Sequence, residues 1–151
     1  MITLRRTVYA SMLLYAIACA LPALTVEDTF NPEIVTWFGV ILLILGWLGV
    51  LLGQLAWLAN LSLFLAWLLA FLKRKWAALP FSLLAIGLSV DLRRFNQQQI
   101  WSDEAGNCCF VIRSVGPGTY LWYASMAVLV LGLIISLIRP ERSADNPRPS
   151  L

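Results

Sequence analysis

The amino-acid sequence predicts an all-α integral membrane protein, a compact bundle of five, alternatively four, transmembrane helices with one polar loop that has room for a short β-hairpin. Hydrophobic residues make up 60% of the 151 residues and charged residues only 13%, about half the charged share of a water-soluble domain. The run from Ile34 to Leu72 holds no charged side chain. The charges gather at the edges of apolar runs, which is typical of membrane spans and excludes a nucleic-acid-binding face.

The first apolar run, residues 8–24, follows Arg5 and Arg6 and has three interpretations. We favour a retained transmembrane helix, in which Cys19 is a small buried apolar residue. The second interpretation is a cleaved secretory signal peptide, because Ala18-Cys19-Ala20 and Leu21-Pro22-Ala23 match small-residue cleavage patterns. The third is a bacterial lipoprotein signal that ends at Cys19. Residues 25–33 are expected to form a polar loop.

The long uncharged run predicts a helical hairpin. As one straight helix it would measure roughly 58 Å, about twice the ~30 Å hydrocarbon core of a bilayer. Trp37, Trp57 and Trp76 recur about every 20 residues, which is one bilayer thickness along a helix. We therefore expect arms at residues 35–52 and 56–72, with a turn between Gly53 and Asn60. Gly49 and Gly53 form a GxxxG pattern, which lets another helix approach closely.

Two further spans are expected at residues 76–91 and 120–138. Lys73-Arg74-Lys75 precedes the first of them, and the aromatic residues Tyr120, Trp122 and Tyr123 open the second, as a girdle at the membrane boundary. The polar loop between them, residues 92–119, has strand-like segments at 97–102 and 108–112. The membrane domain is expected to cover residues 1–138, and the tail 139–151 is expected to be disordered.

Helix length and charge disagree over the number of spans. Five spans place the termini on opposite sides and divide the basic residues almost evenly. Four spans, with residues 34–72 crossing only once, bring Arg5, Arg6, the Lys73-Arg74-Lys75 cluster and the basic tail to one side, which agrees better with the positive-inside rule. We favour five, because an uncharged interfacial helix over residues 57–72 would be unusual.

The candidates for contacts with a partner, or for packing contacts, are Gln54, Asn60, Asp91, Arg94, Cys108 and Cys109. An amide within an apolar run either contacts a ligand or joins two helices, and we favour the helix contact for Gln54 and Asn60. Asp91 is expected to pair with Arg94, three residues further on. The adjacent cysteines cannot pair with each other without strain, but in an extracytoplasmic loop one can pair with another chain.

The chain contains no His, which excludes His general-base catalysis, His-ligated haem and most zinc and copper sites. Its three cysteines lack a CxxC spacing. We therefore predict no catalytic, cofactor-binding or metal-binding residues.

Four short motifs are spread over the apolar part of the chain: Leu21-Pro22-Ala23, Gly46-Trp47, Trp57-Leu58-Ala59-Asn60 and Tyr120-Leu121-Trp122-Tyr123-Ala124-Ser125. In these motifs the chain resembles an uncharacterised family of small multi-pass bacterial inner-membrane proteins. It departs from that pattern at Leu61, where a Pro is expected after Asn60. The resemblance implies a bacterial inner membrane and assigns no activity or functional residues.

We expect a non-enzymatic multi-pass membrane protein with an interaction, accessory or immunity-type role. The interiors of the expected spans carry no ionisable residue, and one polar segment is available to meet a partner. The alternative is a subunit of an oligomeric transporter or channel, although ion pathways normally place charged residues inside the bundle. A lipid-modifying enzyme ranks third. The candidate residues for it have no spacing that assigns catalytic roles: Asp91, Asp103, Glu104, Cys108 and Cys109. The expected partners are the lipid bilayer and either another membrane protein or a second copy of the chain, without nucleic acid or a cofactor.

Overall fold

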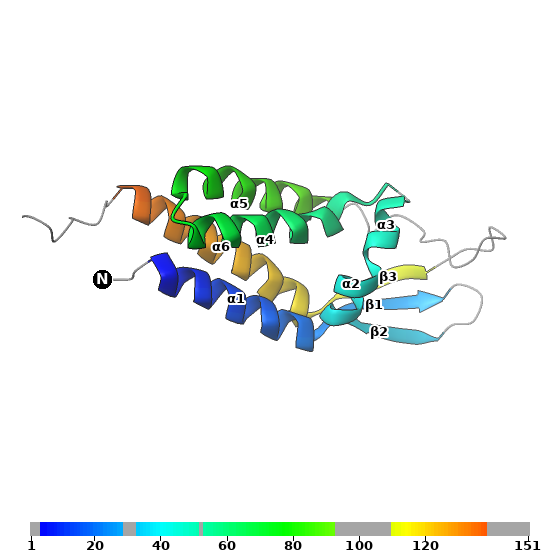
Figure 1. The fold of residues 1–151 in the computed structure, drawn as a ribbon. Coiled ribbons are helices and arrows are strands. Elements are labelled where there is room, and N and C mark those ends of the chain that lie inside the picture. The colour runs from blue at the N-terminus through cyan, green and yellow to red at the C-terminus, as the bar shows by residue number, and fades with distance from the viewer. Residues whose placement is uncertain (1–3, 29–32, 52, 93–109, 139–151) are drawn as a thin grey trace, which may run out of the picture.

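Four long helices lie side by side, and a small sheet with several short helices covers one end of them (Figure 1). The computed structural model describes residues 4–28, 33–51, 53–92 and 110–138. The long helices are α1 (Leu4–Ala20), α4 (Leu58–Phe71), α5 (Lys75–Ser89) and α6 (Pro117–Ile138). Helix α1 packs on α6, α6 on α5 and α5 on α4, and α4 in turn touches α1. The four helices therefore form a closed bundle.

The sheet joins segments that lie far apart in the sequence. Its strands are β1 (Pro22–Asp28), β2 (Ile34–Phe38) and β3 (Phe110–Val115), all antiparallel in the order β2-β1-β3. Strand β1 follows α1 directly, and β3 leads directly into α6. Thr25 pairs with Thr36 on one side and with Ser114 on the other. The neighbouring helices α1 and α6 are thus connected to neighbouring strands.

A small core and one ion pair hold the sheet together. Leu24, Val26 and Ile112 form a buried apolar cluster between β1 and β3. Beside them the Arg113 guanidinium donates a hydrogen bond to the Glu27 carboxylate. That hydrogen bond lowers the pKa of Glu27 and raises the pKa of Arg113.

Three short helices link β2 to α4: α2 (Gly39–Leu45), α3 (Trp47–Leu51) and the 3₁₀ helix η1 (Leu55–Trp57). Helix α3 ends in a Schellman motif, in which Gly53 N–H bonds the Val50 carbonyl and Gln54 N–H bonds the Gly49 carbonyl. Gly53 has φ +84°, a conformation that suits glycine because it has no Cβ.

The turn between α4 and α5 repeats this motif with a residue other than glycine. Lys73 N–H bonds the Ala70 carbonyl, and Arg74 N–H bonds the Leu69 carbonyl. Lys73 occupies the left-handed position, with φ 60°. The motif reverses the chain so that α5 runs back along α4.

Small and hydroxyl-bearing residues fill much of the bundle interior, which lets the helices approach closely. The fully buried small residues are Ser11, Ala59, Ala66, Ala78, Ser82, Ala85, Ser89 and Ser125. At the contact between α1 and α6, a Cβ on Gly132 would lie 2.0 Å from Thr7 Cγ2. Only glycine therefore fits at this crossing.

The expectation of an all-α bundle of five, alternatively four, transmembrane helices is wrong. The chain forms a three-stranded antiparallel sheet as well as helices. Within the described ranges, two helical segments are long and apolar enough to cross a membrane, Lys75–Leu92 and Pro117–Ile138. Leu55–Phe71 is apolar but shorter.

The error arises mainly in residues 22–52. Over its described residues, the expected first arm of the hairpin, 35–52, is strand β2 followed by α2 and α3, and these residues therefore do not form a spanning arm. The β-branched residues Ile34, Val35 and Thr36 favour a strand. Gly53 lies beyond the end of α3, so the GxxxG pattern is not a helix-packing face.

Two loop expectations also change. The expected loop 25–33 belongs to β1 as far as Asp28, and the first helix ends at Ala20 rather than at residue 24. Strand β3 overlaps the strand-like segment 108–112, but its partner is β1. Residues 97–102 and the tail 139–151 lie outside the described residues.

Candidate functional site

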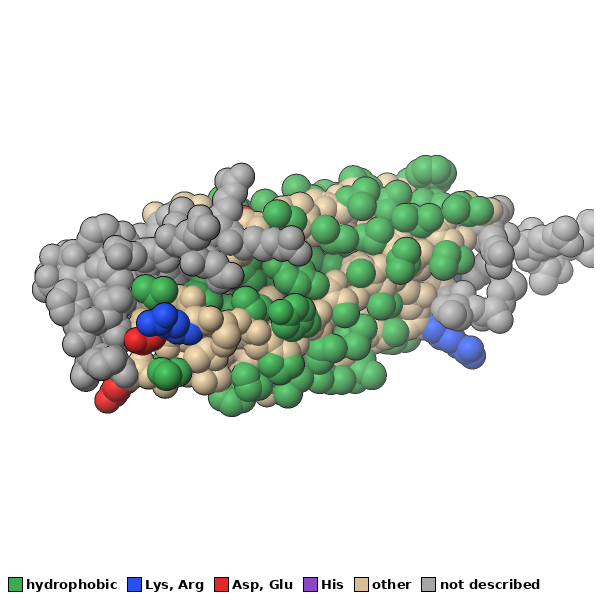
Figure 2. Space-filling model, turned by 180° about the vertical axis from the view of Figure 1, so that it is seen from behind, with side chains coloured by type: hydrophobic (Ala, Val, Ile, Leu, Met, Phe, Trp, Pro, Cys, Tyr) green, Lys and Arg blue, Asp and Glu red, His purple; other side chains and the backbone are tan. Residues whose placement is uncertain are grey.

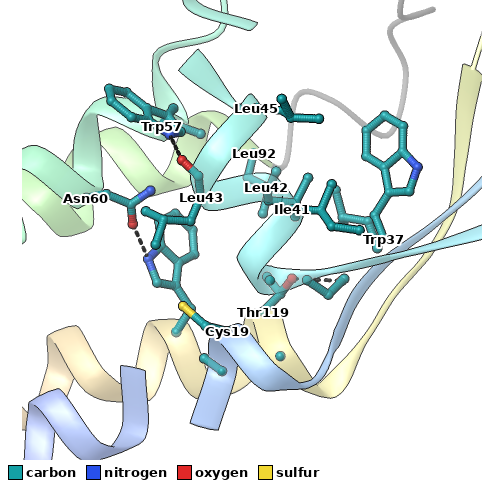
Figure 3. A pocket seen from close by; sticks show the side chains of 18 of the residues that line it. Cys19, Trp37, Ile41, Leu42, Leu43, Leu45, Trp57, Asn60, Leu92 and Thr119 are labelled. Carbon is teal, nitrogen blue, oxygen red and sulfur yellow. Dashed lines mark hydrogen bonds between the residues drawn. The ribbon is translucent and has the colours of Figure 1, made fainter. Parts of the chain in front are cut away.

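A cavity of about 560 Å³ lies where the helix bundle meets the sheet and the short helices (Figure 3). This volume is typical of small-molecule sites, which range over ~300–1,000 Å³. The walls come from the end of α1, the start of α6, strands β1 and β2, helices α2 and α3, and the start of α4. Three tryptophans on different elements, Trp37, Trp57 and Trp122, contribute large flat surfaces.

Glycines allow the elements around the cavity to come together. A Cβ on Gly39 would lie 2.4 Å from the Ala18 carbonyl oxygen, so the start of α2 touches the end of α1. A Cβ on Gly118 would lie 2.9 Å from the same oxygen, so the start of α6 touches it too. The cavity is therefore closed at this corner by backbone contacts.

Trp57 fixes the wall on the α2 side. Its indole Nε1–H donates a hydrogen bond to the Leu43 carbonyl (2.9 Å). This bond ties the start of α4 to the last turn of α2, as the dashed line in Figure 3 shows. Gly46 lies beside the Trp57 ring, where a Cβ would approach Cδ1 to 2.7 Å. The ring and the glycine together set the spacing between α2 and η1.

Asn60 is the polar centre of the cavity wall. Its side-chain oxygen accepts a hydrogen bond from Trp122 Nε1–H (2.9 Å) and another from the Tyr15 hydroxyl (3.1 Å). These bonds join α4 to α6 and to α1. Tyr15 is also packed edge-on against Trp67, with ring centroids 5.4 Å apart. Asn60 thus connects three helices at the inner end of the cavity.

Two further polar side chains line the cavity. The Thr119 hydroxyl donates to the Ala23 carbonyl (2.8 Å), which attaches the first turn of α6 to β1. Gln54 is buried between α3 and η1 and also faces the cavity. Cys19 lies half-buried on the α1 wall. The described lining residues carry no charged side chain.

The structure distributes the six candidate residues over different places. Gln54 and Asn60 both line the cavity. Asp91 lies at the end of α5, where its carboxylate accepts a hydrogen bond from the backbone N–H of Leu55 (2.9 Å). Arg94, Cys108 and Cys109 lie outside the described residues.

The sequence interpretation missed several cavity residues. Trp122 was assigned to a membrane-boundary girdle, yet it points inward and bonds Asn60, whereas its neighbour Tyr120 is 65% exposed. Tyr15 and Thr119 have no role in the sequence interpretation, and Trp57 has one only as a marker of the membrane boundary. A helical-wheel comparison places Trp122 and Ser125 on one face of the last helix, three residues apart, and could have indicated an inward position.

The chemistry of the cavity favours binding. The Tyr15 hydroxyl, the Asn60 amide and the Trp122 indole are hydrogen-bonded to one another, and Trp57 and Thr119 donate to backbone carbonyls, so these five side chains hold the walls in place. In the part of the chain that the structure describes, no group of three or more His, Cys, Asp or Glu residues is arranged to hold a metal ion. The remaining lining is aliphatic and aromatic, which suits an apolar ligand.

Comparisons of the chain with protein-family models, with curated proteins and with solved structures give no significant match.

Proposed function

We propose that the chain is a multi-pass integral membrane protein that acts by binding an apolar molecule rather than by catalysis. The cavity at the junction of bundle and sheet is the binding site, and the bundle is the part embedded in lipid. The proposal extends the finding that two helical segments are long and apolar enough to cross a membrane. The cavity with its mutually hydrogen-bonded polar groups is the observation that carries the binding role.

The distribution of side-chain sizes supports embedding in lipid. The helix interfaces are lined by serines and alanines, whereas large aliphatic side chains point outward. The exposed large residues on the long helices include Leu13, Ile17, Leu61, Leu68, Leu83, Leu84, Leu131 and Ile135. Figure 2 shows apolar side chains over the middle of the visible face, with charges only towards the two ends. Water would make such a surface a site of aggregation, but lipid solvates it.

The two ends of the bundle match the two boundaries of a bilayer. One end carries the charges of Arg5, Arg6, Lys73, Arg74 and Lys75, and the other carries the sheet with Glu27 and Arg113. Exposed aromatic residues stand at both ends, Trp76 at the basic end and Tyr120 at the sheet end. Helix α6 measures roughly 33 Å, and η1 with α4 roughly 26 Å, close to the ~30 Å hydrocarbon core.

The charge distribution also suggests an orientation. Basic residues adjoining spans are retained on the cytoplasmic side. We therefore place the basic end in the cytoplasm and the sheet outside it. The resemblance noted above suggests the inner membrane of a bacterium.

Labelling of introduced cysteines tests this placement. The three native cysteines are replaced by serine, and Lys73→Cys and Thr36→Cys are added one at a time. A membrane-impermeant maleimide should label position 36 from outside, and position 73 only after permeabilisation. Labelling of both positions from one side, or extraction of the protein by alkaline carbonate, would rule out the proposed embedding.

A small apolar photoprobe tests the binding role. Adamantane diazirine, applied to the chain in vesicles, should leave adducts on cavity residues such as Leu42 and Trp37. The outward residue Leu13 reports labelling from bulk lipid. Adducts on Leu13 without any in the cavity would show that no apolar molecule enters.

A second candidate function is that of an accessory protein that binds another membrane protein through β2. Strand β2 is at the edge of the sheet and exposes Ile34 and Phe38, at 70% and 41%. Edge strands with exposed apolar side chains are sites where a partner strand can add. Crosslinking from position 34 in native membranes tests this role, and Ile34→Lys should remove any captured protein.

A further inference from the structure

We infer that the cavity holds one acyl chain of a bilayer phospholipid, which enters from the membrane beside α2 and α3. This inference rests on the proposed function, because it requires both the lipid embedding and an accessible cavity. It names the occupant of the binding site and its route of entry.

The depth of the cavity supports this occupant. The contacts of Gly39 and Gly118 with the Ala18 carbonyl place the start of α2 and the start of α6 at the level where α1 ends. That level is the sheet-side boundary of the proposed bilayer. A phospholipid there keeps its headgroup in the interfacial layer while one chain occupies the cavity.

The wall formed by α2 and α3 is apolar on both sides. Leu42, Leu43 and Leu45 contribute to the cavity lining. Leu45 is also exposed on the molecular surface (53%), as are other residues of the same two helices, among them Ile44 (62%) and Leu51 (76%). None of the residues in α2 or α3 is buried. An uncharged apolar segment exposed at a membrane boundary lies against lipid, so only this thin wall separates the cavity from the bilayer.

Backbone and aromatic rings contribute to the lining of this wall. Gly39, Gly46 and Gly49 line the cavity from α2, the residue after it, and α3. A Cβ at Gly39 or Gly46 would lie within 2.4 Å of a backbone carbonyl oxygen, so these glycines let the wall segments pack closely around the occupant. Trp37 and Trp57 offer flat apolar surfaces in the lining, and methylene groups pack well on such surfaces.

Two polar groups of the cavity wall are already hydrogen-bonded, which favours a hydrocarbon over a polar ligand at their positions. Asn60 Oδ1 already accepts two hydrogen bonds, and the Thr119 hydroxyl already donates one. A polar ligand would have to replace such bonds or bury its own groups without partners, which is costly. An acyl chain needs no hydrogen-bond partner and gains from each methylene that leaves water.

The test uses the full chain in phosphatidylcholine vesicles that contain phosphatidylcholine with a diazirine near the end of one acyl chain. After irradiation, adducts are located by peptide mass spectrometry. We expect adducts on Leu42, Leu43 or Trp37 in addition to those on the outward residues Leu13 and Ile135. This result on the unaltered chain decides the inference without any variant. Adducts confined to outward residues would overturn it.

A matched pair of variants on α1 adds a second measurement. Cys19→Phe places a ring in the cavity, whereas Ile17→Phe adds the same ring on the lipid-facing side, where Ile17 is 41% exposed. Cys19→Phe should reduce the cavity adducts by about tenfold or more, since excluding even two buried methylene groups changes affinity by about that factor. Ile17→Phe should leave them unchanged. Equal cavity labelling in both variants would contradict the inference.

The outcomes separate this inference from the proposed function. Cavity labelling by adamantane diazirine but not by the phospholipid would keep the binding role and exclude the acyl chain. Absence of phospholipid adducts from the outward residues as well would contradict the membrane embedding itself. Phospholipid adducts in the cavity support both.

Discussion

The carboxylate of Asp91, at the end of α5, accepts a hydrogen bond from the backbone N–H of Leu55, the first residue of η1 (2.9 Å). The first N–H groups of a helix lack partners within the helix, and a negative charge there also interacts favourably with the helix dipole. Asp91 therefore acts as a cap that a neighbouring helix supplies to η1 and α4.

Removing this cap should destabilise the fold. We expect Asp91→Ala to lower the free energy of unfolding by about 1 kcal/mol, the usual effect of losing a capping side chain. Asp91→Asn keeps an oxygen acceptor and should retain part of that amount. Thermal unfolding in detergent measures both variants. An unchanged midpoint for Asp91→Ala would show that the hydrogen bond does not contribute to stability.

The bond between Asn60 and Trp122 should show energetic coupling. Asn60→Leu leaves the buried Tyr15 donor and the partly buried Trp122 donor without their acceptor and should cost about 1–3 kcal/mol. Trp122→Phe removes one of those donors. We therefore expect the double variant to be less destabilised than the sum of the two single variants, by about 1 kcal/mol. Strictly additive losses in the double-mutant cycle would contradict a direct bond.

Two glycines on neighbouring helices should respond differently to the same substitution. Gly132→Val drives a side chain into Thr7 at the contact of α1 with α6, and overpacking of this kind costs about 1–3 kcal/mol. Gly87→Val is the matched control, because a Cβ at Gly87 meets nothing within 4 Å. Comparison of the thermal unfolding midpoints of the two variants tests whether α1 and α6 approach closely at Gly132. Equal effects at both positions would argue against the close approach.

The two Schellman motifs predict effects of opposite sign. Gly53→Ala forces a Cβ into the left-handed region and should lower stability by about 1 kcal/mol, although the space around it is open. Lys73→Gly relieves the same strain at φ 60° and should raise stability by roughly 0.5 kcal/mol, after the extra freedom of glycine in the unfolded chain is subtracted. A shift of both midpoints in one direction would exclude strain as the cause.

The ion pair of the sheet predicts a dependence on pH. The hydrogen bond from Arg113 lowers the pKa of Glu27 in the folded protein, so folding favours the ionised carboxylate. The resulting stabilisation is fully present above the unfolded-state pKa of about 4.3 and is lost as the pH falls through the lower folded-state pKa. Unfolding midpoints of the unaltered chain and of Glu27→Gln should differ at pH 7 and converge in acid. If the two unfolding midpoints still differed at low pH, the difference would have a cause other than the ionised carboxylate of Glu27.

The sequence was sufficient to locate the last two long helices. Lys75 and Asp91 bound one uncharged and mainly apolar run, and Tyr120 opens another, so composition alone places α5 and α6 within a few residues. It was not sufficient for β2, because Ile34 to Phe38 is an apolar run that fits a buried helix and a strand equally well. The acidic residues Glu27 and Asp28 suggested a loop, although β1 extends through both.

The site was less predictable than the helices. Asn60 is a candidate from the sequence because it is an amide in an apolar run. Its hydrogen-bond partners Tyr15 and Trp122, however, are separated from it by 45 and 62 positions in the sequence. No local spacing connects such residues, because their proximity depends on how four helices pack. The cavity itself is bounded by a sheet whose third strand is supplied from near the other end of the chain.

The strand order β2-β1-β3 has a consequence for how the protein is made. During synthesis, α1, β1 and β2 emerge early, and β1 can pair with β2 at once as a local hairpin. The other edge of β1 and the α6-facing side of α1 must wait until β3 and α6 leave the ribosome. For most of its synthesis the nascent chain therefore exposes an open edge of β1 and the face of α1 that carries Thr7 and Ser11, and both stay uncovered until the last helix arrives.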